Sequence, residues 1–151
     1  MNIIKILFTL KSIFKKTLDY RAEQTKIFRN NNFDYIKSEE ITKKIITELK
    51  MENYSMGSEH LKIFSAISLK REILNILEIG TFDGYCSVFL SKLFPKSEID
   101  TLDLKDNSEK FKEIYSRENF ENNKKYFQTR KQNLSKSKNI SFQQRGSVSL
   151  I

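Results

Sequence analysis

One stretch near the middle of the chain constrains its fold more than any other part. Residues 73–79 are mostly apolar and end in a turn marked by Gly80 and Gly84. A short apolar run bounded by a turn signal is typical of a parallel strand covered on both faces. From Tyr85, apolar residues return at helical spacing until Pro95 blocks continuation. The stretch therefore predicts a strand, a glycine turn and a helix, with the turn where open α/β sheets bind ligands.

Two later segments predict further strands of the same sheet. Residues 98–104 alternate in polarity and residues 139–144 form another short strand-like run, while residues 108–134 between them are charged and helical in pattern. Strands that alternate with helical segments indicate a parallel α/β sheet. The chain has 151 residues, enough for one ordinary domain. We expect an amino-terminal helical region over residues 1–53 and an α/β domain over residues 54–151.

The amino-terminal region carries further helical patterns. Residues 1–18 combine apolar positions at helical spacing with lysines, which predicts a basic amphipathic helix too short to span a bilayer. This helix either packs on its own domain or on a partner protein, or lies in a membrane interface. Residues 20–38 are polar, and we expect them to be irregular. Ser38 and Ser58 are the predicted N-caps of two following helices.

Composition limits the classes of function. A single cysteine rules out an internal disulfide and a cysteine-based zinc site, and it fits a reducing compartment, so we expect a cytoplasmic protein. The net charge is +8, but residues 39–103 hold 8 basic and 11 acidic side chains, and both flanks are basic. No compact run of Lys and Arg with interleaved aromatics occurs, so nucleic acid is not an expected partner. A metal at His60, the only histidine, would need ligands that the sequence does not offer.

Asp103 ends the second predicted strand, 19 residues after Gly84. An acidic residue at about this distance from a glycine turn can accept both hydroxyls of a nucleoside ribose, because two carboxylate oxygens match the two donors of the diol. The alternative is a solvated aspartate at a strand end. The glycine turn and the aspartate, taken in this order, favour a ligand that contains a nucleoside.

Two common nucleotide-binding motifs do not fit the turn. The dinucleotide fingerprint requires Gly-x-Gly-x-x-Gly, but Phe82 stands at the second glycine position and Tyr85 takes the place after Gly84. No lysine of the P-loop type follows the glycines, which disfavours a nucleoside triphosphatase. The glycine turn therefore fits neither a dinucleotide-binding site nor a P-loop.

Residues 77–85, LEIGTFDGY, resemble motif I of the class I S-adenosylmethionine-dependent methyltransferases. They are most similar to the branch of small-molecule O-methyltransferases with an aromatic residue where other members have the middle glycine. Asp103 resembles the acidic residue that ends that family's second strand, and Gly146-Ser147 resembles the turn after its third strand. The resemblance covers roughly residues 54–150. It implies a Rossmann-like parallel sheet, with three of the usual seven strands supplied here, and S-adenosyl-L-methionine as cofactor.

The resemblance implies a role for eight residues. Gly80 and Gly84 would let the backbone pass close to the amino acid part of the cofactor, and Glu78 would position the turn and reach the methionine end. Asp103 would hold the ribose hydroxyls, and Ser147 would touch the adenine edge, where the family often has an acidic residue. The other three would line the cofactor wall, although the two aromatic ones fit core packing equally well: Thr81, Phe82 and Tyr85.

The resemblance also implies parts that this sequence does not supply. In the family, the fourth strand carries a residue that faces the substrate, so no catalytic base and no metal ligand is assigned here. We expect a carboxyl-terminally truncated methyltransferase for an unknown small-molecule acceptor, inactive alone, whose sheet a partner chain or a second copy completes. The alternative is a non-enzymatic interaction module that uses residues 1–18 to bind a membrane surface or a partner protein.

Overall fold

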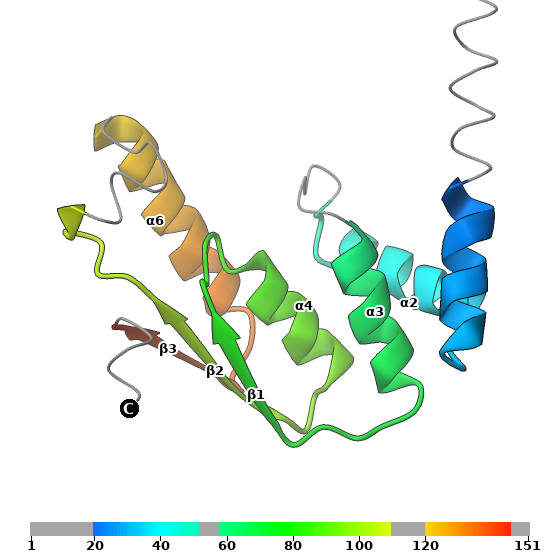
Figure 1. Ribbon diagram of the computed structural model, residues 1–151. Helices are drawn as coiled ribbons and strands as arrows, with labels where there is room; N and C mark the ends of the chain where they lie inside the picture. Colours follow the sequence, from blue (N-terminus) through cyan, green and yellow to red (C-terminus); the bar gives the residue numbers. More distant parts are fainter. Residues whose placement is uncertain (1–19, 52–57, 110–119, 146–151) are drawn as a thin grey trace, which may run out of the picture.

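The computed structural model describes residues 20–51, 58–109 and 120–145 (Figure 1). Residues 20–30 are helical, and the elements that follow are α2 (Tyr35–Glu48), α3 (Ser58–Ser68), β1 (Asn75–Ile79), α4 (Tyr85–Leu93), β2 (Glu98–Asp103), α6 (Phe120–Leu134) and β3 (Ile140–Gln144). Within these ranges, no helix has the length and the apolar character that crossing a membrane requires. Residues 1–18 and Ser147 lie outside the described residues, so the roles expected for them stay predictions.

The three described strands form one parallel sheet in the order β1-β2-β3. The register places Ile76 beside Ile99 and Ile99 beside Ile140, and this row of apolar side chains packs against α4. α4 connects β1 to β2 and α6 connects β2 to β3, as expected where helical crossovers join parallel strands. The predicted α/β fold, a Rossmann-like parallel sheet with amino-terminal helices, is confirmed for the described residues.

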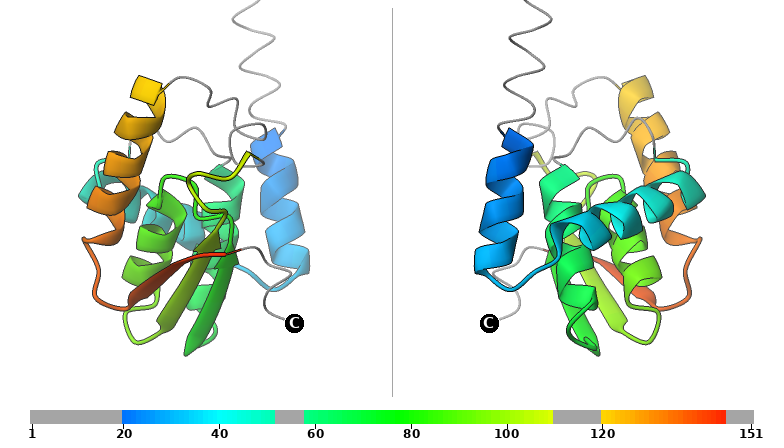
Figure 2. Two further views of the ribbon diagram at one scale, coloured as in Figure 1. Left: turned by 90° about the vertical axis from the view of Figure 1, so that its left-hand side faces the viewer. Right: turned by 90° about the vertical axis from the view of Figure 1, so that its right-hand side faces the viewer.

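The described helices cover only one face of this sheet. The strand order follows the chain without reversal, and crossovers of a single hand then put both connecting helices on the same side. Figure 2 shows helices in front of the sheet in one view and the strands in front of the helices in the opposite view. Leu77 and Ile79 of β1 are accordingly 57% and 63% exposed. The prediction that this strand is covered on both faces is wrong for the described part of the chain.

β1 is also an edge strand among the described residues, because β2 is its only neighbour there. An edge strand with exposed apolar side chains is a ready template for further pairing. The expectation that a partner chain or a second copy completes the sheet stays a prediction.

Two alanine substitutions compare the covered and uncovered faces of the sheet. We expect Ile99→Ala to lower the free energy of unfolding by about 2–5 kcal/mol, because Ile99 lies in the core and is 1% exposed. Leu77→Ala is expected to cost less than about 1 kcal/mol, because most of its side chain already contacts water. Urea unfolding at micromolar concentration measures both costs, and equal costs would show that another surface covers β1 in solution.

Asp34, and not Ser38, caps α2. The Asp34 Oδ1 atom accepts a hydrogen bond from the Lys37 N–H at 3.0 Å. Ser38 is buried inside the first turn of the helix, where its hydroxyl donates to the Asp34 carbonyl oxygen at 2.5 Å. The predicted N-cap at Ser38 is wrong, because an acceptor one turn earlier already starts the helix. The expected irregular segment is also wrong in part, since residues 20–30 are helical.

The amino-terminal helices share a core with the sheet domain. The largest cluster of buried apolar side chains draws on α2, α3, α4 and the residue Met51 after α2; its members are Ile45, Leu49, Met51, Leu61, Val88 and Phe89. A smaller cluster of Phe28, Tyr35 and Ala66 ties residues 20–30 to α2 and α3. This packing fixes the first turns of α3 beside the carboxyl end of β1, where the candidate site lies.

Candidate functional site

The link between β1 and α4 is a tight turn whose backbone is bonded to β2. The N–H groups of Gly80 and Thr81 donate to the Leu102 carbonyl oxygen at 2.8 and 3.2 Å. The Gly84 N–H donates to the Thr81 carbonyl oxygen at 2.9 Å and closes the turn. Gly80, Phe82 and Gly84 have positive φ angles of 94°, 50° and 77°, a region that favours glycine. The glycine turn predicted from the sequence is therefore present at the carboxyl end of a parallel strand.

The two glycines of the turn face different surroundings. A Cβ atom added at Gly80 would meet no other atom within 4 Å, so a ligand has room to approach this part of the backbone. A Cβ atom added at Gly84 would lie 3.1 and 3.2 Å from side-chain atoms of Leu134 in α6. Close approach of a ligand therefore fits Gly80, whereas Gly84 is small because α6 packs against it.

Alanine substitutions at the two glycines are expected to differ in their cost. Gly80→Ala introduces backbone strain of about 1–2 kcal/mol but no steric overlap. Gly84→Ala adds a displacement of Leu134 to a similar strain, so its loss of unfolding free energy is expected to be larger. Urea unfolding measures both losses. In the Gly84→Ala background, Leu134→Ala should cost less than it does alone, and fully additive losses would contradict the steric account.

α6 also holds the turn through side-chain hydrogen bonds. The Asn133 side chain, 3% exposed, donates from Nδ2 to the Asp83 carbonyl oxygen at 2.8 Å. The Tyr126 hydroxyl donates to the Phe82 carbonyl oxygen. These bonds satisfy two backbone oxygens of the partly buried turn. Neither contact has a signal in the local sequence, because Tyr126 and Asn133 stand 44 and 50 positions along the chain from their partners.

Asp103 contacts the turn, as its place in the sequence predicted. Its Oδ2 atom accepts a hydrogen bond from the Phe82 N–H at 3.1 Å, and its Oδ1 atom accepts one from the Leu104 N–H at 2.8 Å. The Arg130 Nη1 atom lies 3.5 Å from Oδ2. The alternative of a solvated strand-end aspartate is excluded, because the Asp103 side chain is only 2% exposed.

Glu78 lies on β1 with its carboxylate turned toward α4. The Ser87 hydroxyl donates to Oε2 of Glu78, and the Thr101 hydroxyl, 2.5 Å away, donates to the same atom. Burial raises the pKa of the Glu78 carboxyl above its ordinary value of 4.5, although the bonds from Ser87, Thr101 and Cys86 act in the opposite direction. Burial beside this carboxyl also raises the pKa of the Cys86 thiol. The carboxylate of Glu78 is thus kept in the protein at an energetic cost.

Glu78→Gln is expected to stabilise the protein at neutral pH more than at acidic pH. Burial raises the pKa of Glu78 in the folded state, so this carboxyl ionises more easily in the unfolded chain. The free energy of unfolding therefore falls as pH rises from the pKa of the unfolded chain to the higher pKa of the folded state. The substituted amide would keep an acceptor oxygen without that ionisation. Thermal unfolding at pH 4 and pH 7 should show a difference in Tm, variant minus wild type, that grows with pH. A difference that shrinks with pH would contradict the raised pKa.

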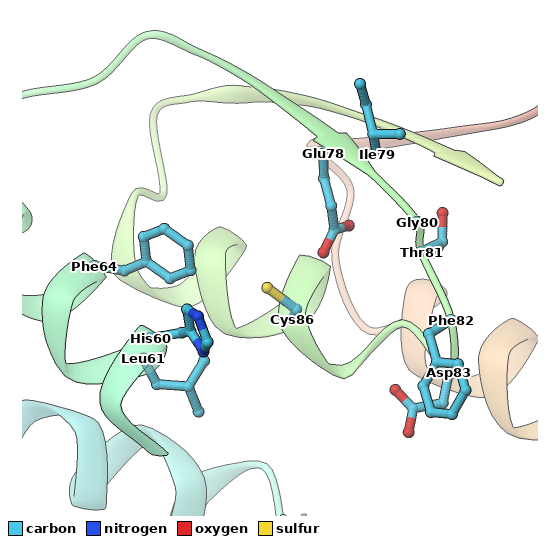
Figure 3. A pocket seen from close by; sticks show the side chains of 10 residues that line it. All are labelled: His60, Leu61, Phe64, Glu78, Ile79, Gly80, Thr81, Phe82, Asp83 and Cys86. Atoms are coloured by element: carbon cyan, nitrogen blue, oxygen red, sulfur yellow. The ribbon is translucent and has the colours of Figure 1, made fainter. Parts of the chain in front are cut away.

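A cavity of about 240 Å³ opens between the turn and the amino-terminal part of α3 (Figure 3). Its wall on the strand side consists of Glu78, Ile79, Gly80, Thr81, Phe82, Asp83 and Cys86, and its α3 wall consists of His60, Leu61 and Phe64. In Figure 3 the Glu78 carboxylate points toward Cys86 and α3, whereas the side chain of Ile79 points the other way. The cavity is smaller than most sites for drug-sized ligands, so it fits one part of a larger ligand.

The cavity wall brings together four of the eight residues predicted for the site: Glu78, Gly80, Thr81 and Phe82. Gly84, Tyr85 and Asp103 are outside the described wall, the first packed on α6 and the last buried under the turn. The sequence also singled out His60 as a residue that could face a ligand, and the structure places it on the wall. The carboxyl of Asp83 joins Glu78 there, and the described wall contains no Lys or Arg, which favours a positively charged ligand group.

Neither a scan against protein-family models nor a search of curated proteins found a match to this chain. Among the described residues, no three His, Cys, Asp or Glu side chains are grouped so that they could hold a metal ion.

Proposed function

We propose that this chain is the S-adenosylmethionine-binding portion of a class I methyltransferase. The observation that carries the proposal is the turn itself: Gly80 leaves open space above the backbone, Glu78 lies in the adjoining cavity, and the Asp103 carboxylate bonds to the same turn. Turns of this kind at the carboxyl end of a parallel strand are where open α/β sheets bind ligands. Motif I, residues 77–85, coincides with this turn.

Each residue of the site has a task in this proposal. Glu78, with Asp83 beside it, would favour the positive charge at the methionine end of the cofactor. The backbone of Gly80 and Thr81 would lie against the cofactor, and the Phe82 side chain would form an apolar wall. Asp103 would accept the ribose hydroxyls, Tyr85 would line the cofactor wall, and Ser147 would touch the adenine edge. When bound, the cofactor supplies the methyl group.

The acceptor would be a small molecule held on the α3 side of the cavity. His60, Leu61 and Phe64 form that wall, and all three come from a helix that precedes the glycine turn in the chain. Transfer of a methyl group depends chiefly on holding donor and acceptor in line, so the site contributes by positioning. We propose a cytoplasmic location, for which the single cysteine is the support. We also propose that the chain is inactive alone, since no residue is assigned as a base.

Isothermal titration with S-adenosylhomocysteine, the demethylated product, tests the proposal. We expect Asp103→Asn to weaken binding at least about tenfold, because hydrogen bonds to a charged carboxylate are lost. Asp100→Asn is the matched control: it removes the same charge from the same strand, at an exposed position, and should leave the affinity unchanged. Thermal unfolding of both variants checks that the fold persists. No binding by the wild-type chain, or equal affinities for both variants, would overturn the proposal.

A further inference from the structure

Arg130 is a buried cation shared between two carboxylates at the end of β2. Its side chain is 5% exposed. The Nη2 atom lies 2.6 and 2.8 Å from the two carboxylate oxygens of Asp106, and Nη1 lies 3.5 Å from Oδ2 of Asp103. The guanidinium is surrounded by three aromatic rings, whose centroids lie 5.4, 5.2 and 4.6 Å from its central carbon: Tyr126, Phe127 and Phe142. Rings at these distances attract the planar cation and keep it near the end of β2, whichever carboxylate it bonds.

The acceptor capacity of Asp103 is almost used up in this arrangement. A carboxylate offers about four lone-pair sites on its two oxygens. The Leu104 N–H occupies one site on Oδ1, while the Phe82 N–H and Arg130 occupy both sites on Oδ2. Counting the donors that the described residues provide, one site remains, on Oδ1. A ribose diol that donates two hydrogen bonds therefore needs one site that is already taken.

Of the three donors on Asp103, Arg130 is the one that can leave. The Phe82 and Leu104 N–H groups belong to the backbone, and the first is part of the bonded turn. Arg130 makes its shorter contacts to Asp106, and its contact to Asp103 is at the long limit for a hydrogen bond. If Arg130 gives up Asp103, it keeps the Asp106 ion pair.

We propose that Arg130 occupies the place of one ribose hydroxyl on Asp103, and that Asp106 sets how easily Arg130 withdraws. Arg130 is thus a positioning residue that determines the affinity for a ribose diol, and Asp106 is its second anchor. This inference rests on the proposed function, because it takes Asp103 as the residue that accepts the ribose. The ligand class it specifies is a nucleoside with both ribose hydroxyls.

Asp106→Asn tests the inference, with Asp100→Asn as the control of equal charge change. The neutral amide in Asp106→Asn would hold the guanidinium less strongly, so Arg130 would shift its interaction to Asp103 and compete better with the ligand. We expect S-adenosylhomocysteine to bind Asp106→Asn about tenfold more weakly than Asp100→Asn in isothermal titration, a difference of about 1.4 kcal/mol. The Asp106 side chain is 32% exposed, which favours retention of the fold in the variant.

The 2′-deoxy analogue of S-adenosylhomocysteine separates competition from general damage to the site. This analogue donates one ribose hydrogen bond and needs only the site that is already free on Asp103. Its affinity should therefore be the same in Asp106→Asn and Asp100→Asn. A loss of affinity for both ligands in Asp106→Asn would assign Asp106 a purely structural role and overturn the inference.

The remaining outcomes are also decisive. If the wild-type chain binds and the two variants have equal affinities for S-adenosylhomocysteine, Arg130 does not compete, and this inference fails while the proposed function stands. Tighter binding by Asp106→Asn would likewise overturn it. If the wild-type chain binds neither ligand, the proposed function fails and this inference fails with it.

Discussion

The site depends on the pair of hydrogen bonds that tie Gly80 and Thr81 to the Leu102 carbonyl oxygen. These bonds continue the pairing of β1 with β2 beyond the end of the strand and hold the turn against its neighbour. As a result, Glu78 of β1 and Asp103 of β2 lie beside the same turn. Asn133 of α6 adds a hydrogen bond to the Asp83 carbonyl oxygen, so that bonds from two elements hold the turn with its positive φ angles.

The layer beneath the turn is polar, which costs stability. The hydroxyls of Thr81 and Thr101 lie 2.7 Å apart, and those of Thr101 and Ser87 donate to the Glu78 carboxylate. Burying a carboxylate is unfavourable even when it is hydrogen-bonded, and apolar side chains in the same space would pack without that cost. The arrangement keeps a carboxyl group at the wall of the cavity at a cost in folding free energy.

Short-range pattern was enough to predict much of the site. The apolar run, the glycines and the following helix are contiguous, so their local preferences fix the turn, and Glu78 and Gly80 lie on the wall of the cavity beside it. The spacing of Asp103, 19 residues after Gly84, indicated a shared site with the turn, and the structure places its carboxylate in contact with the Phe82 N–H. Arg130 was missed, since its contacts to Asp103 and Asp106 join positions 27 and 24 residues apart and leave no local signal.

The sequence by itself determined the succession of strands and helices from β1 onward, the glycine turn and the carboxylate at the next strand end, because each depends on residues close together in the chain. Only the tertiary structure decided that Gly84 faces α6, that Leu77 and Ile79 are exposed, and that Asp103 is held by Arg130. The physical reason is that burial and ion pairing depend on which elements meet in space. An apolar strand has the same residue pattern whether one face of its sheet is covered or both.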